Sequence, residues 1–571
     1  MTSVSSSTSS TATTSGTASS SSSANVTTTG TTNSTSVDWD ALIEAQVAAK
    51  TAQATNITTK ITANKAKIAA YQNLQSLLST LATSTKSLSN SVINSLSGSA
   101  FATRSATITA TGDLSASSAL SMSISDGAAT GDHTLTISQL ATAQSVVGTA
   151  VADRTSELGY DGTFSIGVAG GTSADIAVTS DMSMDDIVSA INAQTSTTDV
   201  QASIIQVSSS KYEMVLTATV DNAEIKTSSV SGTDVMNKLG VTDSDGGFAD
   251  VLQTAQAAVF TLDHVELTRD SNDITDVLTG VTFNLLQTTP TGTAINVSIG
   301  TDTDTIATDV QSLVTAYNAF RDYVYSQQSV GSDGTADSSE VLFGDSTMRD
   351  VMSQVMAALN TSIGGLSLAD LGLSFDETND LEFDSSTLAD TLTTNLDGAV
   401  ALMATSVTTS SSNLSVINTG SSPPASFTLD LTVDASGALT SASVGGDSSL
   451  FTVSGDTIIG AAGSIYAGLA FNYRGSTSQS ISVTSTSGIA AQIYSLAKTI
   501  SNTSTGSLQV LITNLQTQDD TMQQRADTIT SAAATYEANL KVEYANYQSA
   551  IESANSMLDY LTALLKSSSD S

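Results

Sequence analysis

Cysteine is missing altogether from this chain of 571 residues. Without thiols the protein cannot form a disulfide, bind a metal through thiolate ligands or use a cysteine nucleophile. Histidine, a common residue in acid-base catalysis and metal binding, occurs only as His133 and His264. Both lie in segments with a strand-like pattern and no nearby acidic or nucleophilic motif, so we interpret them as ordinary sheet or surface residues. Stability therefore has to come from packing and assembly.

Basic residues are also few: 18 Lys and Arg stand against 55 Asp and Glu, and the formal net charge is -37. A surface this acidic repels phosphate backbones and anionic lipid headgroups, so we expect no nucleic-acid partner and no membrane partner. No apolar run is long enough to span a bilayer. The first basic residue is Lys50, so the N-terminus lacks the cationic start and apolar segment of a secretory signal peptide.

Motifs for catalysis and cofactor binding are missing too. There is no GxSxG, no phosphate-binding glycine loop, no HExxH and no dinucleotide fingerprint. Asp243, Asp245 and Asp250 are spaced somewhat like a calcium loop, but the loop has no glutamate at its twelfth position. A second acidic group alternates with apolar residues as a strand, a turn and a strand would, and comprises Asp376, Glu377, Asp380, Glu382 and Asp384. We predict no catalytic residue, no metal site, no cofactor and no enzymatic activity.

The N-terminal region combines a low-complexity tract with a helical stretch. Residues 1–36 are almost entirely Ser, Thr, Ala and Gly, which predicts disorder because they bury too little apolar surface to offset backbone entropy. From Asp38 to about Leu96 there is neither Pro nor Gly, and apolar residues recur every three or four positions. This pattern predicts a long helix, with a break near Thr83 to Lys86.

A second helical stretch closes the chain. No Gly or Pro follows Gly506, and each of the two stretches covers nearly sixty residues, or roughly 85 Å as a straight helix. Two stretches of matched length would most simply pair with each other and carry the intervening residues as a head. Many of their core positions hold Ala, Thr, Asn or Gln, so we expect weak coiled coils that become fully ordered in an assembly.

The residues between these helices predict strands and shorter helices. Residues 101 to about 300 alternate apolar and polar side chains between turns, with one short helix capped by Ser183 and Asp186. Further helices are predicted from Thr305 to about Tyr325, over Ser346–Leu359 and over Ser385–Met403, with a hairpin over Leu373–Phe383 and another β-rich region over 425–485. The chain is therefore of the α+β class with several domains.

Six pieces of sequence occur in an order specific enough for comparison with known families. They are Val37–Gln46, Ala69–Leu74, Gly131–Gln144, Thr268–Phe283, Ala316–Asn318 with Gly344–Ser346, and Leu371–Leu373. Through them the chain after residue 36 resembles the FliD family of flagellar filament cap proteins, also called flagellar hook-associated proteins. The Ser/Thr tract of residues 1–36 departs from the short start of that family.

The resemblance implies a leg of paired terminal helices, a coiled coil or helical bundle, with inserted β-rich head domains. The expected division is a tail (1–36), N-terminal leg helices (37–100), a split β-rich head domain (101–135 and 250–300), a second β-rich head domain (136–249), the helical-bundle and hairpin part of the stalk (301–405), an additional β insertion (406–490) and C-terminal leg helices (491–571). The expected filament and self-assembly contacts are Ile57, Ile61, Ile68, Tyr71, Leu74, Leu78, Leu540, Tyr544, Tyr547, Ile551, Leu558, Leu561 and Leu565.

The resemblance also implies a function and partners. A cap at the distal end of the filament would promote folding and polymerisation of exported flagellin and prevent its loss. The implied partners are flagellin, the hook-filament junction protein, an export chaperone before secretion, and further copies of the chain in a ring of about four to six subunits. The implied location is the flagellum tip outside the cell, reached without a cleavable signal peptide.

Other functions remain open at the level of the sequence. A flagellin or a hook-filament junction protein would also have helical termini around a variable head, and the Thr268–Phe283 segment is what favours the cap. A β-rich head could also act as a surface adhesin for glycans, alone or beside capping. A secreted hydrolase that uses acidic pairs is the third alternative.

Overall fold

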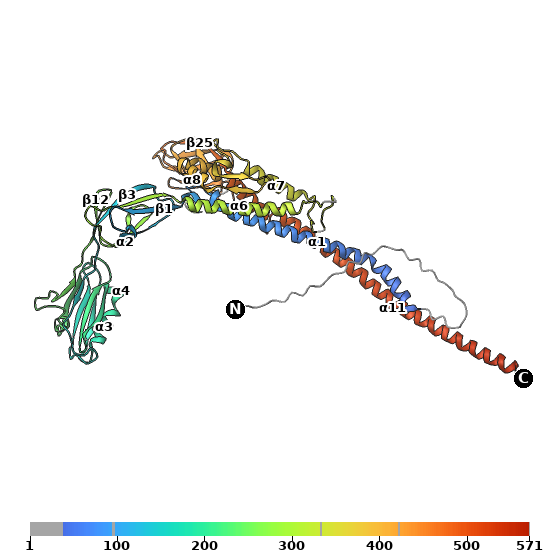
Figure 1. The fold of residues 1–571 in the computed structure, drawn as a ribbon, viewed down its shortest axis with the longest axis horizontal. Coiled ribbons are helices and arrows are strands. Elements are labelled where there is room, and N and C mark those ends of the chain that lie inside the picture. Colours follow the sequence, from blue (N-terminus) through green and yellow to red (C-terminus); the bar gives the residue numbers. More distant parts are fainter. Residues whose placement is uncertain (1–37, 94–97, 332–333, 338, 421–422, 570–571) are drawn as a thin grey trace. The chain divides into compact units, whose positions relative to one another are not determined.

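The computed structural model describes residues 38–93, 98–331, 334–337, 339–420 and 423–569. The described residues form two compact units: unit 1 contains those up to residue 62 and from residue 518 on, and unit 2 contains those between residues 63 and 517. Long helices lie at both ends of the described chain, and the strands lie between them, as Figure 1 shows. This confirms the predicted α+β class with inserted β-rich parts. The tract predicted to be disordered, residues 1–36, lies outside the described residues.

The terminal helices are α1 (Trp39–Ser89) and α11 (Ser507–Ser569). The predicted break near Thr83 is wrong, because α1 continues through it. The hydroxyl of Thr83 donates to the Ser79 carbonyl at 2.9 Å, and that of Thr85 donates to the Leu81 carbonyl at 2.8 Å. A hydroxyl that donates to a carbonyl of the preceding turn has its hydrogen bond within the helix and does not interrupt it. The helix does end earlier than predicted, at Ser89 instead of about Leu96.

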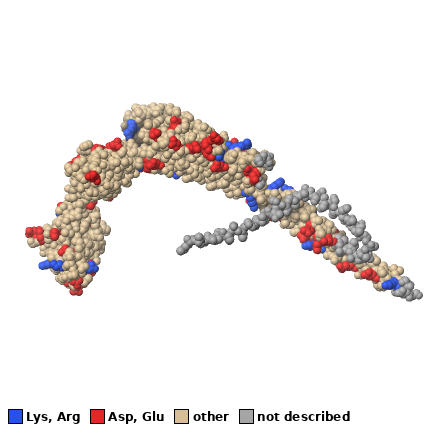
Figure 2. Space-filling view, viewed as in Figure 1, with Lys and Arg blue, Asp and Glu red and all other residues tan. Residues whose placement is uncertain are grey.

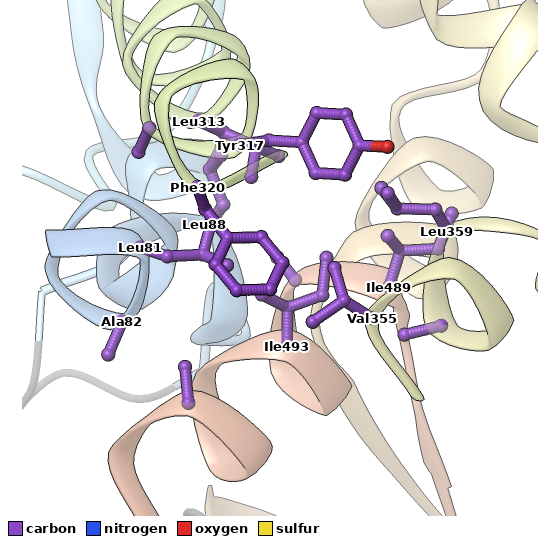
Figure 3. Packing of buried hydrophobic residues seen from close by; sticks show 14 of the residues in the cluster. Leu81, Ala82, Leu88, Leu313, Tyr317, Phe320, Val355, Leu359, Ile489 and Ile493 are labelled. Carbon is purple, nitrogen blue, oxygen red and sulfur yellow. The ribbon is translucent and has the colours of Figure 1, made fainter. Parts of the chain in front are cut away.

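Unit 2 contains a helical core. Residues of α1 pack there against α6 (Thr303–Ser326), α7 (Ser346–Leu359) and α10 (Ile489–Ser501). Figure 3 shows Leu81 and Leu88 of α1, Tyr317 and Phe320 of α6, and Ile493 of α10 converging in this core. The core thus joins segments from the beginning, middle and end of the chain. The same core includes α8 (Ser385–Thr394), α9 (Leu396–Met403), the short helices η1 (Ala100–Ala102) and η2 (Leu368–Leu371), and the hairpin β16 (Leu373–Phe375) and β17 (Leu381–Phe383).

The single helix predicted over Ser385–Met403 is wrong, since the structure has α8 and α9 there. Asn395 lies between them with φ -151° and ψ 58°, outside the helical region. Its side chain accepts from the Gly398 amide at 3.1 Å and caps the second helix. Asn is a favourable N-cap residue, which explains the interruption.

One β-rich core is built from two separate stretches of the chain, between residues 104 and 139 and between 258 and 301. Strand β3 extends to Gln139, past the expected domain boundary at 135. The core lies between a five-stranded sheet of order β1-β15-β3-β11-β12 and a three-stranded sheet of order β13-β14-β2. Their bounds are β1 (Arg104–Ala110), β2 (Leu120–Ile124), β3 (Gly131–Gln139), β11 (Ala258–Leu262), β12 (Val265–Arg269), β13 (Asp273–Leu278), β14 (Val281–Leu285) and β15 (Ile295–Thr301), with helix α2 (Ala116–Ala119) beside them.

A second β-rich core contains residues between Val146 and Val241. The helix α3 (Met184–Asn192) covers it, and the capping box predicted at Ser183 and Asp186 is confirmed. The sheets have the orders β10-β4-β8-β7 and β6-β5-β9. Their bounds are β4 (Ser145–Val147), β5 (Gly162–Val168), β6 (Ser173–Val178), β7 (Val200–Ser208), β8 (Lys211–Ala218), β9 (Ile225–Gly232) and β10 (Val251–Gln253), with helices α4 (Thr195–Thr198) and α5 (Val235–Lys238).

A third β-rich core lies between α9 and α10 in sequence. Two four-stranded antiparallel sheets, of orders β18-β25-β20-β21 and β19-β24-β23-β22, enclose it. Alternating strands bury one face and leave hydroxyl side chains on the other, as expected of a sandwich. The bounds are β18 (Thr405–Thr409), β19 (Leu414–Thr419), β20 (Ser426–Val433), β21 (Leu439–Ser443), η3 (Ser448–Leu450), β22 (Phe451–Ser454), β23 (Thr457–Gly460), β24 (Leu469–Tyr473) and β25 (Gln479–Ser487).

Candidate functional site

Aromatic rings join the two terminal helices inside unit 1. The ring of Trp39, the sole tryptophan of the chain, stacks on Tyr544 with centroids 4.9 Å apart and planes inclined by 28°. Tyr547 lies beside both, 6.5 Å from Trp39 and 6.2 Å from Tyr544. Stacked and tilted arrangements at these separations are the favourable ones for aromatic pairs. The start of α1 is thereby fixed against α11.

Polar contacts continue this pairing along the helices. Gln46 donates through Nε2 to the Tyr544 hydroxyl at 2.9 Å, and its Oε1 accepts from the Tyr536 hydroxyl at 2.8 Å. The ammonium of Lys50 lies 4.5 Å from the centre of the Tyr536 ring, a cation–π contact. Because Gln46 bonds two tyrosines eight residues apart, a shift in register between the helices would break both bonds.

The sequence prediction of contact residues missed Trp39, Gln46, Lys50 and Tyr536. These residues pair through rings, amides and charge, which apolar spacing does not indicate. The spacing of these residues in the sequence was a usable signal. Tyr536 and Tyr544 are two turns apart on one face of the C-terminal helix, and Trp39, Gln46 and Lys50 follow at intervals of seven and four on the N-terminal helix.

The predicted contact residues of α1 are buried or half-buried by other parts of the same chain. Ile61 is buried in unit 1, and Ile57 is half-buried. Tyr71, Leu74 and Leu78 are buried in the helical core of unit 2, against which Ile68 also packs. The core side chains are already covered by the same chain. For them the monomer's own packing explains the helical spacing without another subunit.

Tyr71 holds α1 to the start of α7. Its hydroxyl donates to Oδ2 of Asp345 at 2.6 Å, while Oδ1 of the same carboxylate accepts from the Met348 amide at 3.0 Å. Burial, reinforced by the adjacent carboxylate, raises the pKa of Tyr71 far above its ordinary value. The hydroxyl therefore stays protonated and keeps donating. A second bond, from the Tyr323 hydroxyl to the Ala70 carbonyl at 2.8 Å, lies next to it.

The predicted contact residues of α11 form a graded series. Leu540 is buried and Tyr544 is half-buried, whereas Tyr547 and the residues after it are exposed. The exposed fraction reaches 62% for Leu558, 52% for Leu561 and 70% for Leu565. We call the large apolar residues of this part of α11 the C-terminal apolar surface; they are Val542, Tyr547, Ile551, Met557, Leu558, Tyr560, Leu561, Leu564 and Leu565. So many exposed apolar side chains on one helix segment are typical of an interaction site.

His133 and the acidic groups have hydrogen-bond partners in the structure. Nδ1 of His133 lies 2.8 Å from Oδ2 of Asp263, and the hydrogen bonds from His133 and from the Thr134 amide lower the pKa of Asp263. His264 follows Asp263 in the two-residue turn between β11 and β12. Within the described ranges no group of three or more His, Cys, Asp or Glu side chains is arranged to hold a metal ion.

The two acidic groups close turns. Oδ1 of Asp243 accepts from the amides of Asp245 and Gly247, each at 2.9 Å. Asp376 accepts in the same way from the amides of Thr378 and Asp380, both at 2.8 Å, in the turn of the β16–β17 hairpin. This arrangement agrees with the strand-turn-strand pattern read from the sequence.

Family models match most of the described chain. The model described as "Flagellar hook-associated protein 2 C-terminus" matches residues 255–556, more than half of the chain. The chain belongs to this family. The corresponding N-terminal model matches residues 35–144, and a flagellin hook IN motif matches residues 163–220. Members of this family are the FliD filament cap proteins, so the resemblance seen in the sequence is confirmed. The Thr268–Phe283 segment lies within the C-terminal match and forms β13, most of β14 and the end of β12.

Relatives of known identity bear the same name. Flagellar hook-associated protein 2 of Escherichia coli K12 is 28% identical over 386 residues, which cover 64% of this chain and 78% of the relative. The B-type flagellar hook-associated protein 2 of Pseudomonas aeruginosa is 26% identical over 302 residues, covering 49% and 63%. A solved structure of D1-D2-D3 domains of the flagellar cap protein FliD from Escherichia coli is 27% identical, covers 59% of this chain and 90% of that one, and has a TM-score of 0.46.

The hook-associated protein 2 family is a family of structural flagellar proteins. In the described part of this chain no helix combines the length and the apolar character needed to cross a membrane. Acidic side chains outnumber basic ones over the face shown in Figure 2. The candidate functional site of this chain consists of the paired helices α1 and α11 and the C-terminal apolar surface.

Proposed function

We propose that this chain caps the distal end of the flagellar filament, where it promotes folding and polymerisation of exported flagellin and prevents loss of the subunits. The observation that carries the proposal is the combination of family membership with an exposed apolar surface on the terminal helix α11. Exposed leucines of a water-soluble helix need a partner, because covering each removes apolar area from water. The end of a polymer built from helical termini is such a partner.

Docking then uses the C-terminal apolar surface. Tyr547, Ile551, Leu558, Leu561 and Leu565 contact the filament end, whereas Leu540 and Tyr544 hold α11 to α1. The predicted residues Ile57 and Ile61 support the same helix pair. Tyr71, Leu74, Leu78 and Ile68 act through the helical core and keep unit 2 together. A contact made by one helix face is moderate in strength, which suits a cap that must shift as subunits are added.

The assembly proposal extends to further partners. A ring of about four to six copies forms the cap, the hook-filament junction protein is the partner before filament growth, and an export chaperone covers the exposed apolar side chains before secretion. The protein acts outside the cell at the flagellum tip. The acidic surface, with a net charge of -37, disfavours nucleic-acid and membrane partners.

We keep the domain division of the sequence as part of this proposal. Residues 37–100 and 491–571 form the leg, 301–405 the stalk part, 406–490 a β insertion, and 101–135 with 250–300 and 136–249 the two head domains. Separate apolar cores in these regions support the division, except that β3 of the first head core runs past residue 135 to Gln139. Family membership speaks against the alternatives of a flagellin or a junction protein.

A deletion strain tests the proposed function. Loss of a cap should leave cells with hooks but without full filaments, and flagellin monomers should collect in the medium. Expression of the full chain should restore filaments and motility. Normal filament length without this chain, or restored filaments with continued flagellin release, would contradict the proposal. Electron microscopy of the purified chain added to filament ends is the direct complement.

A further inference from the structure

A groove of about 740 Å³ lies in unit 2 and is lined by residues between Arg321 and Asp380. Its walls are the end of α6, one face of α7 and the turn of the β16–β17 hairpin. The floor is apolar and carries Val324, Met352 and Met356, and Tyr325 forms an edge with 64% of its surface exposed. Methionine side chains adapt to different partners, so this floor can accept varied apolar residues.

Charge distinguishes this groove from a plain apolar hollow. Glu377 and Asp380 line it, and Asp322 and Asp376 lie next to it on the same elements. Its single base, Arg321, is engaged by Asp322 at 3.0 Å and by Asp380 at 3.3 Å. The four carboxylates exceed the one guanidinium, so the rim is negative and complements a basic partner.

A side-chain donor without a hydrogen-bond partner also belongs to a residue that lines this groove. Nε2 of Gln328, a residue that lines the groove, is buried and has no hydrogen-bond acceptor within the described part of the chain. A buried donor without an acceptor is costly, and a polar group of a bound segment would relieve that cost.

The neighbouring strand is closed to backbone pairing at one point. The side chain of Asn318 donates to the Leu381 carbonyl at 3.0 Å and accepts from the Leu381 amide at 2.8 Å. Because both backbone groups of Leu381 are satisfied, β17 cannot add a strand there. The groove can still recognise a docked helix through the side chains of that helix.

From these observations we propose that the groove binds an amphipathic helix of a partner protein, with an apolar ridge flanked by lysine or arginine. The ridge enters between Met352, Met356 and Val324, and the basic residues approach Glu377 and the other rim carboxylates. This goes beyond the capping proposal and does not depend on it, because it concerns a different surface of the chain.

The test uses the full chain with a fluorescent reporter in the groove. Trp39→Phe combined with Tyr325→Trp leaves one tryptophan, placed at the groove edge. The probes are a short amphipathic peptide of leucine and lysine and the same peptide with glutamate in place of lysine. We expect the lysine peptide to shift the tryptophan emission to shorter wavelength with saturation, and the glutamate peptide to leave it unchanged.

Variants locate the binding. Glu377→Lys should weaken binding of the lysine peptide about three- to fivefold, as a surface charge pair does, and Met352→Gln about fivefold through lost apolar contact. The matched controls are Glu266→Lys, an exposed acid on β12, and Met122→Gln, another half-buried methionine. Both controls should bind as the parent does, and circular dichroism should show all variants folded.

Three results would overturn the proposal. Equal binding of the two peptides would remove the charge argument, and equal affinity of the groove variants and their controls would place the peptide elsewhere. If the emission shifts as the concentration of the chain rises without peptide, and the lysine peptide does not reverse that shift, a second copy of the chain and not a basic helix occupies the groove.

Discussion

Replacing leucines of the C-terminal apolar surface should weaken docking without unfolding the chain. Leu558 and Leu561 are 62% and 52% exposed, so covering them by a partner removes most of what each still shows to water. Full burial of a leucine side chain is worth about 1.5–3 kcal/mol, which scales to about 1–2 kcal/mol for each of these two. The double change Leu558→Ser with Leu561→Ser should therefore cost about 2–4 kcal/mol, or roughly 30- to 900-fold in affinity for filament ends.

The control uses the same helix. Val510, also on α11, is 52% exposed and lies outside the C-terminal apolar surface, so Val510→Ser matches Leu561→Ser in exposure. The assay is binding of labelled chain to purified filaments with free ends, together with flagellin released by cells that carry each variant. Thermal unfolding of all variants should match the parent, since the replaced side chains are exposed.

The reasoning would be refuted by either of two outcomes. If the double variant binds filament ends as tightly as the parent, the C-terminal apolar surface is not the docking surface. If Val510→Ser loses as much affinity as the double variant, binding responds to helix composition in general and not to this surface.

Three further predictions concern the fold. Tyr71→Phe removes the bond to the Asp345 carboxylate and should lower the free energy of unfolding of unit 2 by about 1–2 kcal/mol, measured by urea denaturation; an unchanged midpoint would contradict the contact. Trp39 reports on unit 1, so its fluorescence should change at lower urea than the circular dichroism of the whole chain, because few fully buried residues hold that unit; coincident curves would count against this. Asp302 caps α6, and the backbone and side-chain hydrogen bonds from Thr305 lower its pKa from 3.8. Its contribution to the free energy of unfolding is therefore present above pH 3.8 and is lost as the pH falls through the lower pKa of the folded state. Thermal unfolding from pH 7 to pH 2 should show less acid destabilisation for Asp302→Asn than for the parent, and parallel curves would refute the assignment.

Pattern alone accounts for much of the helical structure. The absence of Gly and Pro from Asp38 to Leu96 and after Gly506 determined two long helices, since nothing in those stretches interrupts the backbone hydrogen bonds. The capping box at Ser183 is equally local, because its partners lie within one turn. The family followed from segments whose order does not depend on the tertiary structure.

Local pattern failed where a side chain can serve either of two structures. Asn395 interrupts the stretch Ser385–Met403 because its amide caps a new helix, while Thr83 and Thr85 leave α1 intact because their hydroxyls bond the preceding turn. Both types of residue favour caps and turns in general. The residue type alone therefore does not indicate which of the two structures such a side chain will stabilise.

The sequence by itself determined that the stretches after Asp38 and after Gly506 are amphipathic helices, because the spacing of their apolar residues is a property of consecutive residues. It could not determine what covers each apolar face. Tyr71 and Leu561 follow the same three-and-four spacing, yet Tyr71 is buried by α7 and the helical core while Leu561 stays exposed. Burial depends on contacts between segments hundreds of residues apart, and only the tertiary structure brings those segments together.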